Sequence, residues 1–115
     1  MRAALTLSVP ALLVFSALVT DAQSSAPDPH ALFLKNCATC HGETGDGQGT
    51  TQLDRPARSF KDGGFSFGNT PETLFRTLSV GIPGTPMPAF EESPSVAERE
   101  CLAAYVITLG PPVEE

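Results

Sequence analysis

The sequence has few basic side chains, no visible internal repeat and little sign of β-strands. Its 115 residues include 7 Lys and Arg against 13 Asp and Glu, which gives a formal net charge of −6 at pH 7. Proteins that bind a phosphate backbone present a basic face, so this composition argues against nucleic acid as a partner. The strict polar and apolar alternation of half-buried strands is also missing, and this favours an all-α fold.

Cysteine and histidine are scarce as well, but most of them fall in one motif. The chain has three Cys and two His, and residues 37–41 read Cys37-Ala38-Thr39-Cys40-His41. Two thiols three residues apart with a histidine directly after the second are the attachment signature of c-type haem. On one helical turn both sulfurs share a face and can form thioethers with the haem vinyl groups, while the histidine supplies the proximal iron ligand. The motif predicts one thioether-linked haem c per chain.

Two other kinds of site use a Cys-x-x-Cys pair. A zinc site needs a second ligand pair, and only Cys101, His30 and His41 remain, at no usual finger or ribbon spacing. A dithiol redox motif normally opens a helix after a strand, whereas a helical pattern precedes this motif. Both alternatives are weaker than haem attachment. We expect Cys101 to be a small buried apolar residue, with an intermolecular disulfide as the less favoured alternative.

Residues 1–22 have the pattern of a secretory signal peptide. Arg2 is the only charge before an apolar stretch from Ala3 to Val19, and small residues follow. Residues 20–22 fit a cleavage site only loosely, and the apolar run is near the lower limit for spanning a bilayer. An uncleaved membrane anchor therefore stays open as the alternative. In both cases we expect an exported, periplasmic location, which agrees with haem attachment on the outer side of the bacterial membrane, and contact with the membrane only if the segment is retained.

The rest of the chain divides into a polar linker at residues 23–29, one domain at residues 30–110 and a C-terminal tail at residues 111–115. Three helices are predicted in the domain, over about 30–39, 70–80 and 95–109. Thr70 is the expected N-cap of the second helix, and Ser95 pairs with Glu98 in a capping box at the start of the third. The glycine- and phenylalanine-rich stretch between the first two helices is expected to be irregular.

A haem iron bound by one histidine has a sixth position to fill or to leave open. Met87 is the candidate ligand, because it is the only methionine besides Met1 and lies between Pro86 and Pro88. A methionine in a small protein usually fills the core, but flanking prolines fix the backbone of a loop and suit the presentation of one thioether to a metal. His30 is the rival ligand. It lies in the same predicted helix as the haem motif, so we expect it to be a surface histidine.

With these two ligands in place, the chain resembles the class I c-type cytochromes, which are small, exported and monohaem. The resemblance covers about residues 29–109, and its specific parts are the segments Cys37–Gly42 and Gly84–Phe90. It implies an all-α cytochrome c-like fold, with three or more helices and long loops wrapped around one covalently bound haem. In that family the first and last helices cross, which implies contact of Phe33 with Leu102 or Tyr105.

The resemblance also implies contacts around the cofactor. The backbone carbonyl of Pro56 is expected to accept a hydrogen bond from the second ring nitrogen of His41, which would fix the orientation and basicity of the ring. Arg55 or Arg58 is expected to pair with a haem propionate, the alternative for each being a solvated surface arginine.

The predicted function is one-electron transfer by an exported carrier whose iron is held by His41 and Met87. We expect it to dock transiently with a redox protein donor and an acceptor, and not to be an enzyme. One alternative is a haem subunit fixed in a larger oxidoreductase complex. Another is a haem peroxidase or gas sensor, which applies if Met87 is not a stable ligand.

Overall fold

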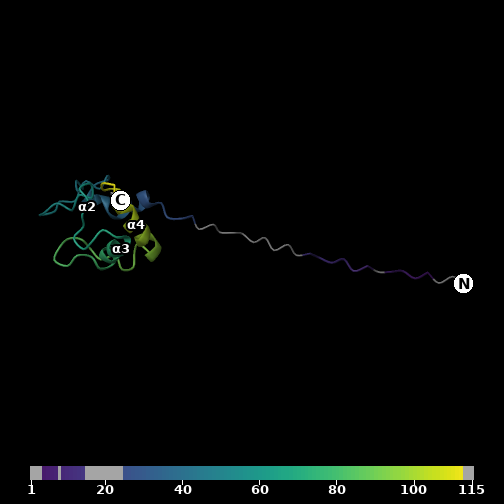
Figure 1. Cartoon of the computed structure of the whole chain (residues 1–115). Helices are drawn as coiled ribbons and strands as arrows, with labels where there is room; N and C mark the ends of the chain where they lie inside the picture. The colour runs from purple at the N-terminus through teal and green to yellow at the C-terminus, as the bar shows by residue number, and fades with distance from the viewer. Residues whose placement is uncertain (1–3, 8, 15–24, 113–115) are drawn as a thin grey trace.

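The computed structural model describes residues 4–7, 9–14 and 25–112. Within these residues the chain forms four helices and no strand (Figure 1). The helices are α1 (Pro29–Asn36), α2 (Ala38–His41), α3 (Pro71–Val80) and α4 (Val96–Thr108). The all-α fold predicted from the sequence is confirmed.

The N-cap residues predicted for α3 and α4 are confirmed. The side chain of Thr70 accepts a hydrogen bond from the Thr73 backbone N–H, and Thr73 returns the contact, which completes a capping box. At the start of α4, the Glu98 carboxylate accepts from the Ser95 backbone N–H at 2.8 Å and the Ser95 hydroxyl accepts from the Glu98 N–H. Each box satisfies N–H groups that have no partner inside the helix, so both helices begin where the sequence predicts.

The first predicted helix is not continuous. Helix α1 begins one residue earlier than expected, at Pro29, because the Asp28 carboxylate caps its first turn. It ends at Asn36, since Cys37 adopts φ −124° and ψ −36°, and the chain starts again as the single turn α2. The N–H of Cys37 still donates to the carbonyl of Phe33 at 2.9 Å. The break gives the haem motif a turn of its own at the end of α1.

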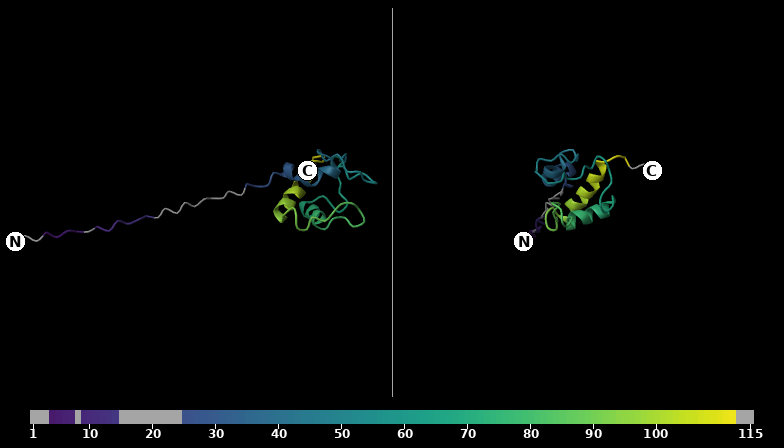
Figure 2. Two further views of the ribbon diagram at one scale, coloured as in Figure 1. Left: turned by 180° about the vertical axis from the view of Figure 1, so that it is seen from behind. Right: turned by 90° about the vertical axis from the view of Figure 1, so that its left-hand side faces the viewer.

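The core lies where α4 packs against both α1 and α3, as the two views of Figure 2 show. Phe33 of α1 and Leu102 of α4 are almost fully buried. The centroid of the Phe33 ring lies 5.6 Å from that of the Tyr105 ring. The expected crossing of the first and last helices is confirmed. The buried side chains of Leu74 and Leu78 cover another part of α4, so α4 is shared between two helices.

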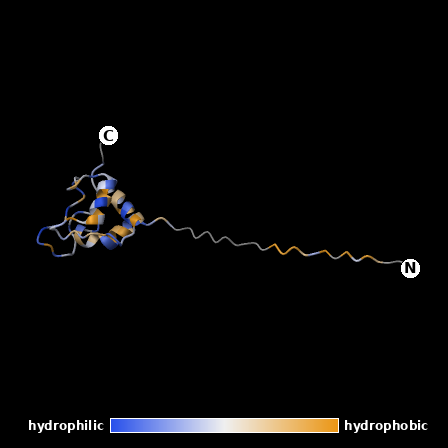
Figure 3. Cartoon of the chain, turned by 90° about the horizontal axis from the view of Figure 1, so that it is seen from below, coloured by the Kyte–Doolittle hydropathy of each residue, from blue (hydrophilic) through white to orange (hydrophobic). Residues whose placement is uncertain are grey.

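The N-terminal residues that the structure describes, 4–7 and 9–14, lie outside the core. They form no helix or strand, and their leucine and valine side chains are exposed. The ribbon of this segment is largely orange, the colour of hydrophobic residues, in Figure 3. No helix in the described ranges has the length and apolar character needed to cross a bilayer. The expected cleavage site at residues 20–22 lies outside the described residues, so both the signal peptide and the anchor stay predictions.

Phe33 is the side chain on which the packing of α1 against α4 most depends. We expect Phe33→Ala to lower the free energy of unfolding by about 3–5 kcal/mol, because it leaves a cavity in the contact with α4. The adjacent Leu34 is 39% exposed, so Leu34→Ala should change the free energy of unfolding by about 1 kcal/mol or less. Chemical denaturation of the haem-loaded protein measures both values, and equal losses would contradict this description of the core.

Candidate haem site

The two motif cysteines lie on one turn, as their spacing predicts. The Cys40 N–H donates to the Cys37 carbonyl at 3.2 Å, and the His41 N–H donates to the same carbonyl at 2.9 Å. Both thiols are free and half-buried. The turn therefore presents two reduced sulfurs at its edge together with the histidine that follows.

The surroundings of Cys37 disfavour a charged sulfur. Burial, together with the neighbouring Cys40, raises the pKa of the Cys37 thiol from 9.0 to about 11. A thiol in this position is neutral at physiological pH. A thioether sulfur carries no charge either, so the apolar surroundings suit a covalently attached form.

The ring of His41 is oriented by the backbone. Its Nδ1–H donates to the carbonyl oxygen of Arg58 at 3.0 Å. The expected acceptor, the carbonyl of Pro56, is thus wrong by two residues. The Phe60 N–H donates to the Gly45 carbonyl at 2.7 Å, which ties the chain two residues after Arg58 to the glycine-rich loop.

This hydrogen bond also decides the chemistry of the ring. A carbonyl only accepts, so Nδ1 carries the proton and the lone pair is left on Nε2, the form in which histidine binds a metal. Burial lowers the pKa of His41 below 6.5; the hydrogen bond to the Arg58 carbonyl opposes this shift, and the charge of Arg58 adds to it. At neutral pH the ring is uncharged and can act as a ligand.

Aromatic rings support the face of His41. The Phe60 ring stacks on it with a centroid separation of 4.5 Å, and Phe65 stacks on Phe60 at 5.7 Å. The guanidinium of Arg58 donates to the Gly64 carbonyl at 3.1 Å and to the Ser66 hydroxyl at 3.0 Å. Arg58 thus contacts the ring through its carbonyl and holds the Phe65 segment through its side chain. The pairing of Arg55 or Arg58 with a propionate stays a prediction.

The glycine-rich loop after the motif packs closely against it. The Gly47 N–H donates to the His41 carbonyl at 2.7 Å, and the Thr51 N–H donates to the Thr39 carbonyl at 2.8 Å. A Cβ atom at Gly49 would overlap the backbone carbonyls of Thr39 and Cys40. Glycine is therefore required here by close backbone approach.

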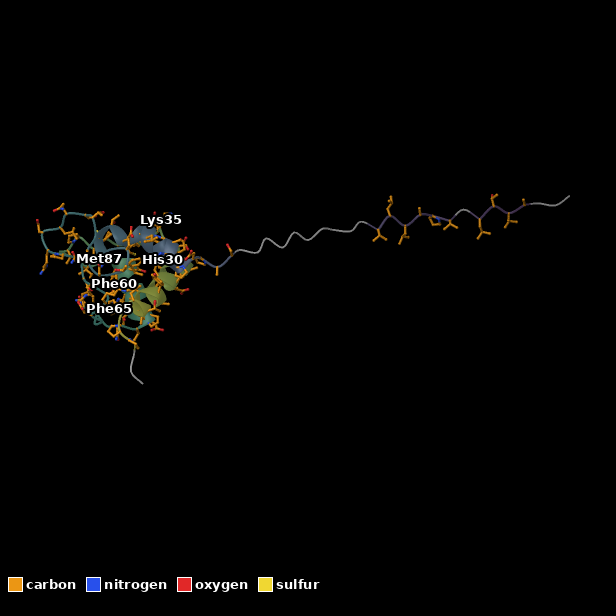
Figure 4. The ribbon with its side chains drawn as sticks, turned by 90° about the horizontal axis from the view of Figure 1, so that it is seen from above. His30, Lys35, Phe60, Phe65 and Met87 are labelled. Carbon is orange, nitrogen blue, oxygen red and sulfur yellow. The ribbon has the colours of Figure 1, made fainter. Side chains whose placement is uncertain are left out.

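The structure brings Met87 to the same core as this stack. Its side chain is half-buried against the buried cluster that contains Phe60. Figure 4 labels Met87, Phe60 and Phe65, which all lie within the folded domain and away from the extended N-terminal residues. The Met87 N–H donates to Thr85 Oγ1 at 3.2 Å and its carbonyl accepts from the Ile82 N–H at 3.2 Å, so the backbone of the loop is fixed locally.

Two other predicted residues lie as follows. His30 is exposed, as expected of a surface histidine, and its Nδ1 is 3.0 Å from the Tyr105 hydroxyl. Cys101 is only half-buried, and its Sγ lies 3.7 Å from the Pro27 carbonyl. Its thiol is thus less deeply buried than expected, although the segment before α1 contacts it.

Sequence reasoning missed two arginine roles. The sequence suggested a propionate partner or a solvated surface arginine for Arg58, whereas its guanidinium holds the Phe65 segment. Arg99 is buried in α4 although it stands between Glu98 and Glu100, a polar run that indicates a solvated face. No signal in the sequence distinguishes either role, because both depend on which backbone carbonyls the fold brings near.

Over the residues that the structure describes, the domain is helical and has no strand, and the histidine that ends its Cys-x-x-Cys-His turn is neutral. These features define a c-type cytochrome. The chain belongs to the family described as cytochrome C oxidase, cbb3-type, subunit III, whose model matches residues 24–106. The resemblance noted in the sequence is confirmed.

Similar proteins agree with this assignment. The cbb3-type cytochrome c oxidase subunit FixP of Azorhizobium caulinodans is 37% identical over 79 residues, which are 69% of this chain and 25% of that protein. Subunit CcoP of Azospirillum brasilense is 33% identical over 91 residues, 79% of this chain and 30% of that protein. The chain thus spans about a quarter to a third of the length of these curated relatives.

Solved structures also share the fold. One chain titled Kuenenia stuttgartiensis reducing HAO-like protein complex aligns with a TM-score of 0.64 and 30% identity, over 72% of this chain and 42% of its own length. The KustC0563 c-type cytochrome aligns with a TM-score of 0.57 and 25% identity, over 74% of this chain and all of its own length. The cofactor of a c-type cytochrome is covalently bound haem c, and this is the cofactor of the present domain.

The residues present fit that cofactor. Two free thiols share one turn, and the adjacent histidine is neutral with its Nε2 lone pair free. A half-buried thioether belongs to the same core. The two thiols would suit covalent attachment of haem c, and the imidazole nitrogen and the thioether sulfur would suit ligation of its iron.

Gly49 offers a test of the close approach between the loop and the motif. We expect Gly49→Ala to lower the free energy of unfolding by about 1–3 kcal/mol, because the methyl group overlaps the backbone of the motif turn. The exposed neighbour Gln48 is the control, and Gln48→Ala should change stability by about 0.5 kcal/mol or less. Chemical denaturation of the haem-loaded variants is the measurement, and a Gly49 variant as stable as the control would contradict the packing.

Arg58 offers a test of the contact with the Phe65 segment. In Arg58→Met the carbonyl that accepts from His41 remains, but the bonds to Gly64 and Ser66 are lost. We expect the backbone amides of this segment to exchange with deuterium about 2- to 10-fold faster. The exposed Arg55 is the control, and Arg55→Met should leave these rates unchanged. Unaltered exchange in the Arg58 variant would show that the guanidinium does not hold the segment.

Proposed function

We propose that this chain transfers single electrons through its covalently attached haem c as one relay of a larger oxidoreductase complex. The cbb3-type oxidase subunits FixP and CcoP are relatives at 37% and 33% identity, and one structural neighbour is part of a protein complex. These likenesses favour the fixed haem subunit over the lone carrier that the sequence first suggested. The bound haem supplies the one-electron couple between ferrous and ferric iron.

Four side chains are proposed to hold the cofactor. Cys37 and Cys40 form the thioether bonds, His41 is the proximal ligand through Nε2, and Met87 is the distal ligand. The observation that carries the proposal is the hydrogen bond from His41 Nδ1 to the Arg58 carbonyl, which leaves Nε2 unprotonated beside two free thiols. The same bond increases the basicity of the ring and fixes its plane.

The proposed distal ligand decides between electron transfer and catalysis. A thioether is a soft ligand that favours the ferrous state, and with both axial positions filled no substrate reaches the iron. Met87 is suited to this role because its backbone is fixed at both its N–H and its carbonyl. A peroxidase or a gas sensor requires an open position, so these functions apply only if Met87 does not bind.

A free carrier that docks transiently with a donor and an acceptor is the second candidate. The likeness to the KustC0563 c-type cytochrome favours it, because that whole chain is covered by the match. The acidic net charge of −6 suits a partner with a basic docking face, and equally serves solubility. For either candidate we propose an exported, periplasmic location, supported by the signal-like segment at residues 1–22 and the haem attachment motif.

The distal ligand is tested by gas binding. Native ferrous protein, matured in a host that attaches haem during export, should keep low-spin spectra under carbon monoxide. Met87→Ala should bind the gas at about one equivalent per haem, since the sixth position opens. The exposed Val80 provides the control, and Val80→Ala should behave as native. Ready carbon monoxide binding by the native protein would overturn the ligand assignment and electron transfer through a closed site.

The choice between subunit and carrier is tested by size. In a mild-detergent or soluble extract of the native source, the haem of a fixed subunit elutes from gel filtration with other oxidoreductase chains. Elution of the haem at the size of this chain alone would favour the free carrier.

A further inference from the structure

Arg99 is a buried charge that the proposed electron transfer does not use. It lies on α4 and is 6% exposed, whereas arginine is rarely buried without a partner. Its neighbours Glu98 and Glu100 are acidic, but its own hydrogen bonds do not go to a carboxylate. The guanidinium therefore points into the molecule for another reason.

The contacts of Arg99 are with the chain that follows Met87. One terminal nitrogen donates to the backbone carbonyls of Phe90 and Glu91. The guanidinium carbon lies 5.4 Å from the centroid of the Phe75 ring, which is a cation–π contact with α3. Within the described residues, Nε has no hydrogen-bond partner. The Arg99 guanidinium, the Phe75 ring and the two carbonyls therefore lie together where α3, α4 and the Met87 loop meet.

This junction is the anchor of the Met87 loop. The Phe90 N–H donates to the Leu78 carbonyl of α3 at 2.8 Å, while Arg99 of α4 binds the carbonyl of the same residue. Phe90 is only three residues after Met87, so its position limits where the thioether can move. Phe90, Arg99 and Cys37 also line one small pocket, which places the anchor beside the haem motif.

Stability alone does not account for this arginine. A buried cation with an unpartnered nitrogen stabilises a fold less than an apolar side chain of similar volume that packs in its place. One terminal nitrogen of the guanidinium carries two N–H groups and can, however, hold two successive carbonyls, which an apolar side chain cannot do.

We propose that Arg99 is a positioning residue that holds the C-terminal end of the Met87 loop between α3 and α4 and thereby keeps the Met87 thioether on the iron. The inference rests on the proposed function, in which Met87 is the distal ligand. It assigns to Arg99 no contact with the cofactor. Its effect is on the equilibrium between a closed loop and one from which the thioether has left.

Imidazole binding to the ferric haem-loaded protein measures that equilibrium, because imidazole competes with Met87 for the iron. We expect Arg99→Met to bind imidazole about 10- to 100-fold more tightly than native protein, which corresponds to the loss of hydrogen bonds from a charged donor. Arg99→Lys keeps the charge and N–H donors on a shorter side chain without the guanidinium over Phe75, so it should bind imidazole more tightly than native protein, though less so than the Met variant. Arg76→Met, at an exposed arginine of α3, is the matched control and should bind as native.

The outcomes separate the two proposals. If Arg99→Met binds imidazole with native affinity, the positioning role is wrong. If Arg99→Met does not fold, native affinity in Arg99→Lys overturns the positioning role instead. Faster deuterium exchange of the Phe90 amide in the Arg99 variants, with unchanged exchange in Arg76→Met, supports it. If the native protein binds imidazole as tightly as Met87→Ala, Met87 is not the ligand, and it is the proposed function that fails.

Discussion

The hydrogen bond from His41 to the Arg58 carbonyl is the contact on which the site depends. It joins the haem motif to a segment 17 residues further along the chain, and the intervening loop closes on it through the Phe60 and Gly47 backbone bonds. It also fixes the tautomer, since the donor must be Nδ1 and the lone pair stays on Nε2. Without this bond, the motif still places a histidine beside two thiols and Phe60 still stacks on its ring, but no acceptor fixes which ring nitrogen carries the proton.

Helix α4 connects the two sides of the site. It packs on α1, which leads into the haem motif, and on α3, which leads into the Met87 loop. Phe33 and Leu102 fill the first contact, and Arg99 reaches across the second to the carbonyls after Met87. One helix thus relates the proximal and distal elements, although the two are far apart in the sequence. This arrangement explains how a small domain can fix the positions of both proposed ligands, although long irregular loops separate its helices.

Membership of the cbb3-type oxidase subunit III family agrees with a cytochrome domain that carries a covalently bound haem c. The relatives FixP and CcoP are about three to four times as long as the part that this chain matches, so the shared unit is the cytochrome domain itself. What the shared unit provides is a covalently held redox group on a small scaffold. Whether that scaffold works inside a complex or alone is a property of its surroundings, since the site is built from the same residues in both cases.

The sequence by itself determined the cofactor and the starts of the two later helices, and it predicted the donors. The Cys-x-x-Cys-His spacing, the capping residues Thr70 and Ser95, and the single methionine between prolines are local signals, and each depends only on residues within a few positions. The tertiary structure decided what needs distant partners. It broke the first helix at Cys37 and made Arg58 instead of Pro56 the acceptor for His41; it also turned Arg99 inward. Such contacts depend on which carbonyl the closed loop brings to a side chain, and no local pattern encodes that choice.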